Sequence, residues 1–207
     1  MLFQELFRPG DSRGAFLASV DALARDFRQD HGIGTVHQLG LAVPDAEEAA
    51  RELEAVGAGP FFIAGGETAH WRERGTVRRY TGKIGIGYLH GLELELLEAG
   101  EGSDLYSRFM DPSGKPVLHH LAFVVNDVGF WQRKMEQAGC PIWVEGTIQA
   151  GPMRVDFAYF DTLEPAGVLL EFESYRLLHF LRRRPPPALY HALGRVQKRI
   201  GPRSFRV

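Results

Sequence analysis

The sequence predicts an α+β fold made of one structural unit that occurs twice, each time as a strand, a helix and about three further strands. The first observation is a repeated opening, because an apolar run ends in an aspartate seven residues after Gln38, at Asp45, and seven residues after His120, at Asp127. The second is that a glycine follows each aspartate twelve residues later. Matching spacings of this length indicate an internal duplication.

Each opening run is rich in β-branched and aromatic residues and predicts a buried strand. The aspartate at its end can cap the following helix, and the glycine provides a left-handed exit from that helix. Further strands are predicted at four apolar runs: Pro60 to Ile63, Leu92 to Leu97, Pro141 to Glu145 and Val168 to Glu173. We therefore expect one domain over residues 33–174, with modules over about 35–100 and 117–174.

Two segments flank the duplicated units. Residues 1–32 are expected to form an N-terminal helical extension in which Asp11 or Ser12 starts a helix. Its apolar stripe comprises Phe16, Leu17, Val20, Leu23, Ala24 and Phe27, and either the chain's own sheet or a second subunit must cover it. Residues 175–207 form a basic tail with nine lysines and arginines and no acidic residue. We expect this tail to dock on an acidic surface and not to bind nucleic acid, because no groove-reading motif accompanies its charge.

Within the first module, residues 64–83 are rich in glycine and arginine and predict a loop or ragged hairpin outside the core. The formal charge of −2 and the hydrophobic content of 44% are typical of a globular protein. The longest apolar runs are far shorter than a membrane span, and residues 1–9 lack the pattern of a secretion signal, so we expect a cytoplasmic protein without membrane partners. The single cysteine, Cys140, excludes an internal disulfide and a thiolate metal cluster.

Alternation along the predicted strands indicates a candidate metal site. The last predicted strand of each module carries two glutamates on the face away from its apolar residues. Equivalent positions in the two modules therefore offer Gln38 with His120, and Glu95 with Glu171. One imidazole, two carboxylates and an amide oxygen suit a divalent metal completed by water, such as zinc, nickel, cobalt, manganese or iron. The alternative is that these glutamates are solvated residues on a half-exposed sheet.

These residues resemble the vicinal oxygen chelate superfamily, which includes glyoxalase I, methylmalonyl-CoA epimerase, extradiol dioxygenases and bleomycin-resistance proteins. The resemblance covers residues 35–174 and rests on four ordered motifs: Gln38 to Asp45, Leu94-Glu95-Leu96-Leu97-Glu98, His119-His120-Leu121-Ala122 and Gly167-Val168-Leu169-Leu170-Glu171-Phe172. It implies that paired βαβββ modules form a curved mixed sheet around a metal whose ligands are Gln38, Glu95, His120 and Glu171. The order of these ligands is similar to the zinc form of glyoxalase I, and the resemblance also implies a homodimer.

His37 is the alternative to Gln38, because a histidine at the first ligand position would be more similar to the epimerases or dioxygenases. His37 is the counterpart of His119 in the repeat and lies one residue outside the ligand register. We therefore expect it to face the other side of the sheet unless a bulge intervenes.

The resemblance implies metal-assisted proton transfer next to a carbonyl of a small acyl or keto substrate, catalysed by an isomerase or lyase. Glu171 is the expected base, and Glu95 completes the metal shell with water. The glutathione anchors of glyoxalase I correspond here to Ala42 and Ala99, and Ile84 to Leu89 lacks the extra carboxylate of the epimerases. The resemblance therefore implies neither the glutathione-dependent activity of glyoxalase I nor the epimerase activity for this sequence.

Two other functions stay open at this point. One is an extradiol-type iron dioxygenase that would use His37, His120 and Glu171. The other is a protein that sequesters a small ligand without turning it over. In either case the arginines between Arg72 and Arg79 offer a clamp for a carboxylate or phosphate, or else are solvated loop charges.

Overall fold

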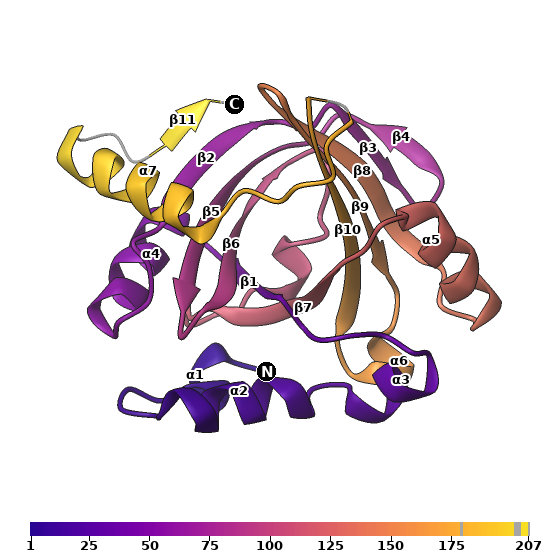
Figure 1. The fold of residues 1–207 in the computed structure, drawn as a ribbon, viewed down its shortest axis with the longest axis horizontal. Helices are drawn as coiled ribbons and strands as arrows, with labels where there is room; N and C mark the ends of the chain where they lie inside the picture. The colour runs from indigo at the N-terminus through magenta and orange to yellow at the C-terminus, as the bar shows by residue number, and fades with distance from the viewer. Residues whose placement is uncertain (179, 201–203, 207) are drawn as a thin grey trace.

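The computed structural model describes residues 1–178 and 180–200, and the backbone of residues 204–206. Figure 1 shows a mixed sheet that curls into an open half-barrel with its helices on the outside. Eleven strands make up this sheet, in the order β11-β2-β5-β6-β1-β7-β10-β9-β8-β3-β4. The predicted α+β class with a curved mixed sheet is confirmed.

The duplication is visible in the order of the elements. The first module contains β1 (Gln38–Val43), α4 (Ala46–Ala55), β2 (Phe62–Glu67), β5 (Thr81–Leu89) and β6 (Leu92–Glu101). The second contains β7 (Val117–Val124), α5 (Val128–Gln137), β8 (Ile142–Ala150), β9 (Met153–Phe160), the short helix α6 (Leu163–Ala166) and β10 (Leu169–Leu177). The connector between the modules carries only the 3-10 turn η1 (Ser107–Phe109).

The predicted helix signals act as expected. Asp45 accepts the backbone N–H groups of Glu47 and Glu48, each at 2.8 Å, and Asp127 accepts that of Phe130 at 3.1 Å. The glycines twelve residues later both adopt a positive φ, of 97° and 80°. Residues with side chains would be strained in this conformation, so these glycines end the helices.

The two modules join through their opening strands. β1 pairs antiparallel with β7, while β6 lies parallel to β1 and β10 lies parallel to β7. The middle of the sheet is therefore β6-β1-β7-β10, which places the strands of all four predicted ligands side by side.

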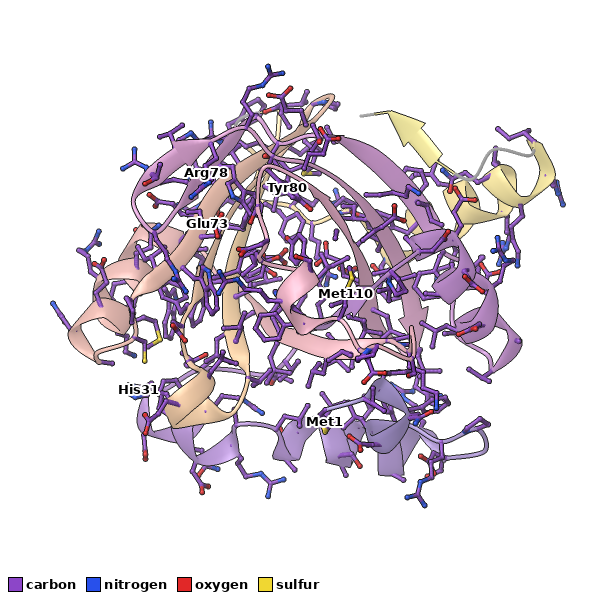
Figure 2. All side chains as sticks on the ribbon, turned by 180° about the vertical axis from the view of Figure 1, so that it is seen from behind. Met1, His31, Glu73, Arg78, Tyr80 and Met110 are labelled. Atoms are coloured by element: carbon purple, nitrogen blue, oxygen red, sulfur yellow. The ribbon has the colours of Figure 1, made fainter. Side chains whose placement is uncertain are left out.

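The segment over residues 64–83 is more ordered than expected. It contains β3 (His70–Glu73) and β4 (Thr76–Arg78), and β3 pairs with β8 of the other module. Glu73 and Arg78, labelled in Figure 2, form an ion pair of 3.7 Å across this hairpin, and Tyr80 is buried. Trp71 is only 1% exposed and stacks on Tyr80 with ring centroids 4.2 Å apart. The prediction that this segment lies outside the core is wrong, because its aromatic side chains fill the inside of the half-barrel.

The N-terminal extension forms α1 (Phe3–Leu6), α2 (Arg13–Ala22) and α3 (Arg25–Asp30), which lie below β1 and β7 in Figure 1. Ser12 caps α2 through the N–H of Ala15 at 3.2 Å. The single helix expected here is broken at Ala24, whose φ is +50°. Phe16 is fully buried in the chain's own core, so the chain's own body covers the stripe.

The tail after residue 177 forms α7 (Pro187–Ile200) and β11 (Ser204–Arg206), and β11 pairs with β2. Two of its cations dock on acidic residues of the same chain: Lys198 lies 2.6 Å from Glu54, and Arg184 forms an ion pair with Glu93. Of the predicted tail cations, Arg203 lies outside the described residues. Among the described helices, none combines the length and the apolar character that a membrane span needs.

Candidate metal centre

Three predicted ligands meet on the concave face of the sheet. Glu95 comes from β6, His120 from β7 and Glu171 from β10. The Nε2 atom of His120 lies 2.9 Å from Oε2 of Glu171 and 3.6 Å from Oε2 of Glu95. One ligand atom from each of the three residues lies within 4.8 Å of the others, and all three residues are buried. Residues separated by up to 76 positions in the chain, from Glu95 to Glu171, thus converge at one point.

Gln38 approaches the same point from β1. Its side-chain Oε1 lies 3.4 Å from Nε2 of His120, and its Nε2 donates to Oε1 of Glu93 at 2.8 Å. Glu93 also accepts a hydrogen bond from Tyr88 and pairs with Arg184. An ionised carboxylate at Glu93 can only accept hydrogen bonds. It therefore holds the side-chain amide of Gln38 with the N–H toward Glu93 and the oxygen toward His120.

Room for the imidazole comes from Gly40, which lies opposite His120 in the β1–β7 register. A Cβ atom at this position would lie 1.9 Å from Cε1 of His120. Any side chain at residue 40 would therefore occupy the space of the histidine ring.

The converging atoms form a cluster of acceptors. Oxygens of Gln38, Glu95 and Glu171 surround Nε2 of His120, and Oε2 of Glu171 has no hydrogen-bond partner among the described residues. Buried polar atoms without partners are rare, because each carries a desolvation cost. A divalent cation would satisfy several of these lone pairs at once, and imidazole with carboxylates is a common ligand set for zinc and related metals. The residues present therefore fit a metal ion.

Burial sets the proton affinities of these groups. Burial, together with repulsion from Glu173 and Glu93, raises the pKa of Glu95 well above its ordinary range. Burial and repulsion from Glu173 and Glu95 do the same for the pKa of Glu171. Burial lowers the pKa of His120 to about 3, so its imidazole is neutral at physiological pH. A neutral imidazole is the form that binds metals.

His119 does not point away from the site, although its place in the repeat suggested the opposite face. Gly40 pairs with His120 and Leu41 pairs with Leu118, so His119 is an extra residue in β7, a β-bulge. Its Nδ1 lies 3.0 Å from Nδ1 of His120, and one proton between these nitrogens completes a hydrogen bond. When His120 holds that proton, its Nε2 lone pair faces Glu95 and Glu171, as metal binding requires.

His37 also reaches the concave side, so the expectation that it faces away is wrong. It precedes the first residue of β1, and its Nε2 lies 3.0 Å from Oε2 of Glu173. Tyr175 donates to the same oxygen at 2.9 Å. Burial alone would raise the pKa of Glu173, but the contacts with His37 and Tyr175 bring it below the ordinary value. His37 therefore contacts a second carboxylate, while Gln38 contacts His120.

A cavity of about 180 Å³ opens beside these residues. Gln38, Glu93, Glu95 and Glu173 are among the polar residues that line it. Its walls come mainly from apolar side chains of β2, β5, β8 and β9, with Tyr175 and Tyr190 from the C-terminal part of the chain. Figure 1 shows the segment before α7 passing across the front of the half-barrel.

Several residues around the site were not singled out from the sequence. Arg184 lies in a run of arginines and prolines that carries no signal for a buried ion pair. The bulge at His119 has no sequence signal either, although the doubled histidine was visible. Tyr159 lies opposite Glu171 in the β9–β10 pair, a register that the sequence alone does not record.

Comparisons with known proteins identify the family of this chain. A family model described as the glyoxalase/bleomycin resistance protein/dioxygenase superfamily matches residues 37–159, and no curated protein matches the chain. Similar solved structures include a hypothetical protein from Bacillus halodurans, with 16% identity over 67% of this chain and 92% of that one and a TM-score of 0.44. Methylmalonyl-CoA epimerase from Mycobacterium tuberculosis has 17% identity over 67% and 85%, with a TM-score of 0.39.

A mutant of 4-hydroxymandelate synthase from Streptomyces coelicolor has 12% identity over 79% of this chain, with a TM-score of 0.48. The matched region is 54% of the synthase, so this chain corresponds to about half of that enzyme. The family model covers more than half of the present chain, and its match spans three of the four converging residues, Gln38, Glu95 and His120. The chain belongs to the glyoxalase/bleomycin resistance protein/dioxygenase superfamily.

Proposed function

We propose that this protein is a metal-dependent isomerase or lyase that transfers a proton next to a carbonyl group of a small substrate. Glu95, His120 and Glu171 would hold the metal, with the amide oxygen of Gln38 as a fourth, neutral ligand. Zinc is the first choice, and nickel, cobalt, manganese and iron suit the same donors. A bound divalent ion would polarise the carbonyl and stabilise the charge that develops on its oxygen.

The chain's own residues would supply the remaining steps. Glu171 would take the proton, because its carboxylate lies at the centre, 2.9 Å from Nε2 of His120, and a ligand carboxylate loosened from the metal can act as a base. Glu93 keeps the Gln38 oxygen directed at His120. The apolar walls of the cavity exclude water from the reacting carbon.

One observation carries this proposal: Oε2 of Glu171 is buried, lacks a hydrogen-bond partner among the described residues and lies 2.9 Å from Nε2 of His120. A purely structural glutamate at this depth would be expected to have its oxygens satisfied. A bound cation that accepts a lone pair from Oε2 of Glu171 and another from Nε2 of His120 would explain this arrangement.

The test begins with metal binding by the full chain. Purified protein is stripped with a chelator and titrated calorimetrically with zinc, nickel, manganese and, without oxygen, iron(II). We expect one equivalent to bind, and Glu171→Gln and His120→Ala to weaken binding at least 100-fold. Glu101→Gln is the matched control, because Glu101 is an exposed glutamate on the same strand as Glu95. Failure of all four metals to bind the wild type would overturn the proposal.

Proton transfer is tested separately from metal binding. The metal-loaded protein is incubated in deuterated water with small hydroxyketones, and exchange of the hydrogen next to the carbonyl is followed by NMR. We expect exchange that is lost in Glu171→Gln. Metal binding without exchange for any such probe would favour a protein that sequesters its ligand.

The iron dioxygenase alternative has less support from the site. It needs His37 as a second histidine ligand, but His37 contacts Glu173, and the three-residue cluster contains one histidine. Turnover of catechol after anaerobic loading with iron(II) would favour that alternative.

A further inference from the structure

The charges around the cavity are unevenly distributed. Its four charged lining residues are all acidic: Glu67, Glu93, Glu95 and Glu173. No lysine, arginine or histidine is among the described residues that line it. A ligand that enters therefore meets carboxylates and apolar side chains, without a cation from the wall to attract an anionic group.

The nearby cations already have acidic partners. Arg79 binds both carboxylate oxygens of Glu67, at 2.8 and 2.7 Å. Lys83 lies 3.0 Å from Glu98, and Arg184 pairs with the buried Glu93. The arginine-rich hairpin behaves in the same way, since Arg72 lies 3.4 Å from Glu145 and Arg78 pairs with Glu73. An anionic ligand would have to separate one of these pairs before it gained a counter-ion.

Most of the cavity wall is apolar. Ile148 of β8 and Val155 of β9 are cross-strand neighbours on it, and Ile84 and Ile86 of β5 also line it. The cavity volume of about 180 Å³ is close to that of cavities that accept a single benzene ring, about 150 Å³. An anionic group placed here would lose hydration without receiving a compensating contact from the lining residues.

We propose that the substrate is a carbonyl compound that carries no anionic group and whose remainder is mainly apolar and about the size of one ring, and that carboxylated or phosphorylated analogues are rejected. This inference rests on the proposed function in one respect, because the metal centre would orient the ligand by binding its oxygens. The selectivity itself comes from the acidic and apolar wall.

Two probes of equal size isolate the effect of charge. 3,4-Dihydroxybenzamide and 3,4-dihydroxybenzoate have neighbouring oxygens that can bind a metal, and they differ at the far end by one negative charge. Binding of each to the zinc-loaded protein is measured by calorimetry without oxygen. We expect the amide to bind at least tenfold more tightly than the carboxylate. Equal binding, or tighter binding of the carboxylate, would overturn the inference.

A variant of the wall provides the second test. Ile148 is partly exposed, so a lysine there can keep its ammonium group at the cavity edge. Ile148→Lys is expected to reduce the preference for the amide at least tenfold by strengthening carboxylate binding. Ile148→Gln is the matched uncharged control and should retain the wild-type preference. If both variants change the preference equally, the wall charge does not determine selectivity.

Failure of this inference and failure of the proposed function give different results. The same pair of probes is also measured with metal-free protein, where the amide should again bind more tightly because the wall is unchanged. Selectivity without deuterium exchange would leave the substrate class standing and remove the catalytic role. Deuterium exchange without selectivity would support the catalytic role and overturn the proposed substrate class.

Discussion

Gln38 donates its amide N–H to Glu93 across 2.8 Å, and this contact leaves its oxygen 3.4 Å from Nε2 of His120. The two residues lie opposite each other in the parallel β1–β6 pair. Glu93 is therefore a positioning residue, which acts on the candidate centre through the amide of Gln38. Such supporting hydrogen bonds commonly change metal affinity by about 10- to 100-fold.

A double-mutant cycle tests this relationship. Glu93→Gln is expected to weaken zinc binding about tenfold, because a glutamine can donate and no longer fixes the orientation of Gln38. In a Gln38→Ala background the same change should have almost no further effect, measured by calorimetric titration. Additive effects of the two changes would mean that Glu93 acts independently of Gln38.

The contact between His119 and His120 predicts a second effect on metal affinity. His119→Phe removes the nitrogen that lies 3.0 Å from Nδ1 of His120 and should weaken zinc binding about 10- to 100-fold. His119→Asn offers an oxygen acceptor and should recover part of that loss. If the His119→Phe and His119→Asn variants bind zinc equally well, the contact does not orient His120.

Gly40 should tolerate no side chain. The Cβ atom in Gly40→Ala would overlap the His120 ring, which packs against Tyr159 and cannot shift freely. We expect a loss of roughly 1–3 kcal/mol in the free energy of unfolding, as for other overpacked cores, together with loss of zinc binding. Urea denaturation and metal analysis provide the measurements. Gly34→Ala is the control, because no atom lies within 4 Å of its added Cβ.

Zinc should stabilise the folded chain. At a free zinc concentration 100 times the dissociation constant, mass action adds about 2.7 kcal/mol to the free energy of unfolding. For a chain of this size that corresponds to a rise in Tm of roughly 5–10 °C. Differential scanning calorimetry with and without zinc checks this rise. Glu171→Gln should show little response, and an unchanged Tm in the wild type would contradict binding at this site.

The C-terminal helix should contribute to stability through Gln197. Its side chain accepts from the N–H of Ile63 at 2.8 Å and donates to the carbonyl of Ile63 at 2.7 Å, both in buried surroundings. Gln197→Ala leaves these backbone groups unpaired and should cost roughly 1–3 kcal/mol in urea denaturation. Gln29→Ala, at an exposed helical position, is the control and should change stability by less than about 0.5 kcal/mol.

Sequence patterns predicted the regular parts of this molecule well. The repeated spacing and the alternation of glutamates indicated both modules and the strands that bring Glu95, His120 and Glu171 together. These features depend on local periodicity, which the sequence records directly. The ligand roles of all four residues, Glu95, His120, Glu171 and Gln38 or its alternative His37, stay a prediction.

The features that were missed depend on contacts between distant parts of the chain. The bulge at His119 arises from register with β1, and the burial of Trp71 arises from pairing with the other module. The ion pair of Arg184 with Glu93 joins residues whose surroundings in the sequence suggest nothing of the kind. No periodicity within one segment contains this information.

The hairpin formed by β3 and β4 has a consequence for how the molecule is made. The ribosome synthesises it with the first module, but its partner strand β8 emerges only after β7 and α5 have been completed. Until then Trp71 lacks the surface of Phe157 against which it packs. The nascent first half therefore exposes aromatic surface and an unpaired strand edge until β8 and β9 of the second module are made.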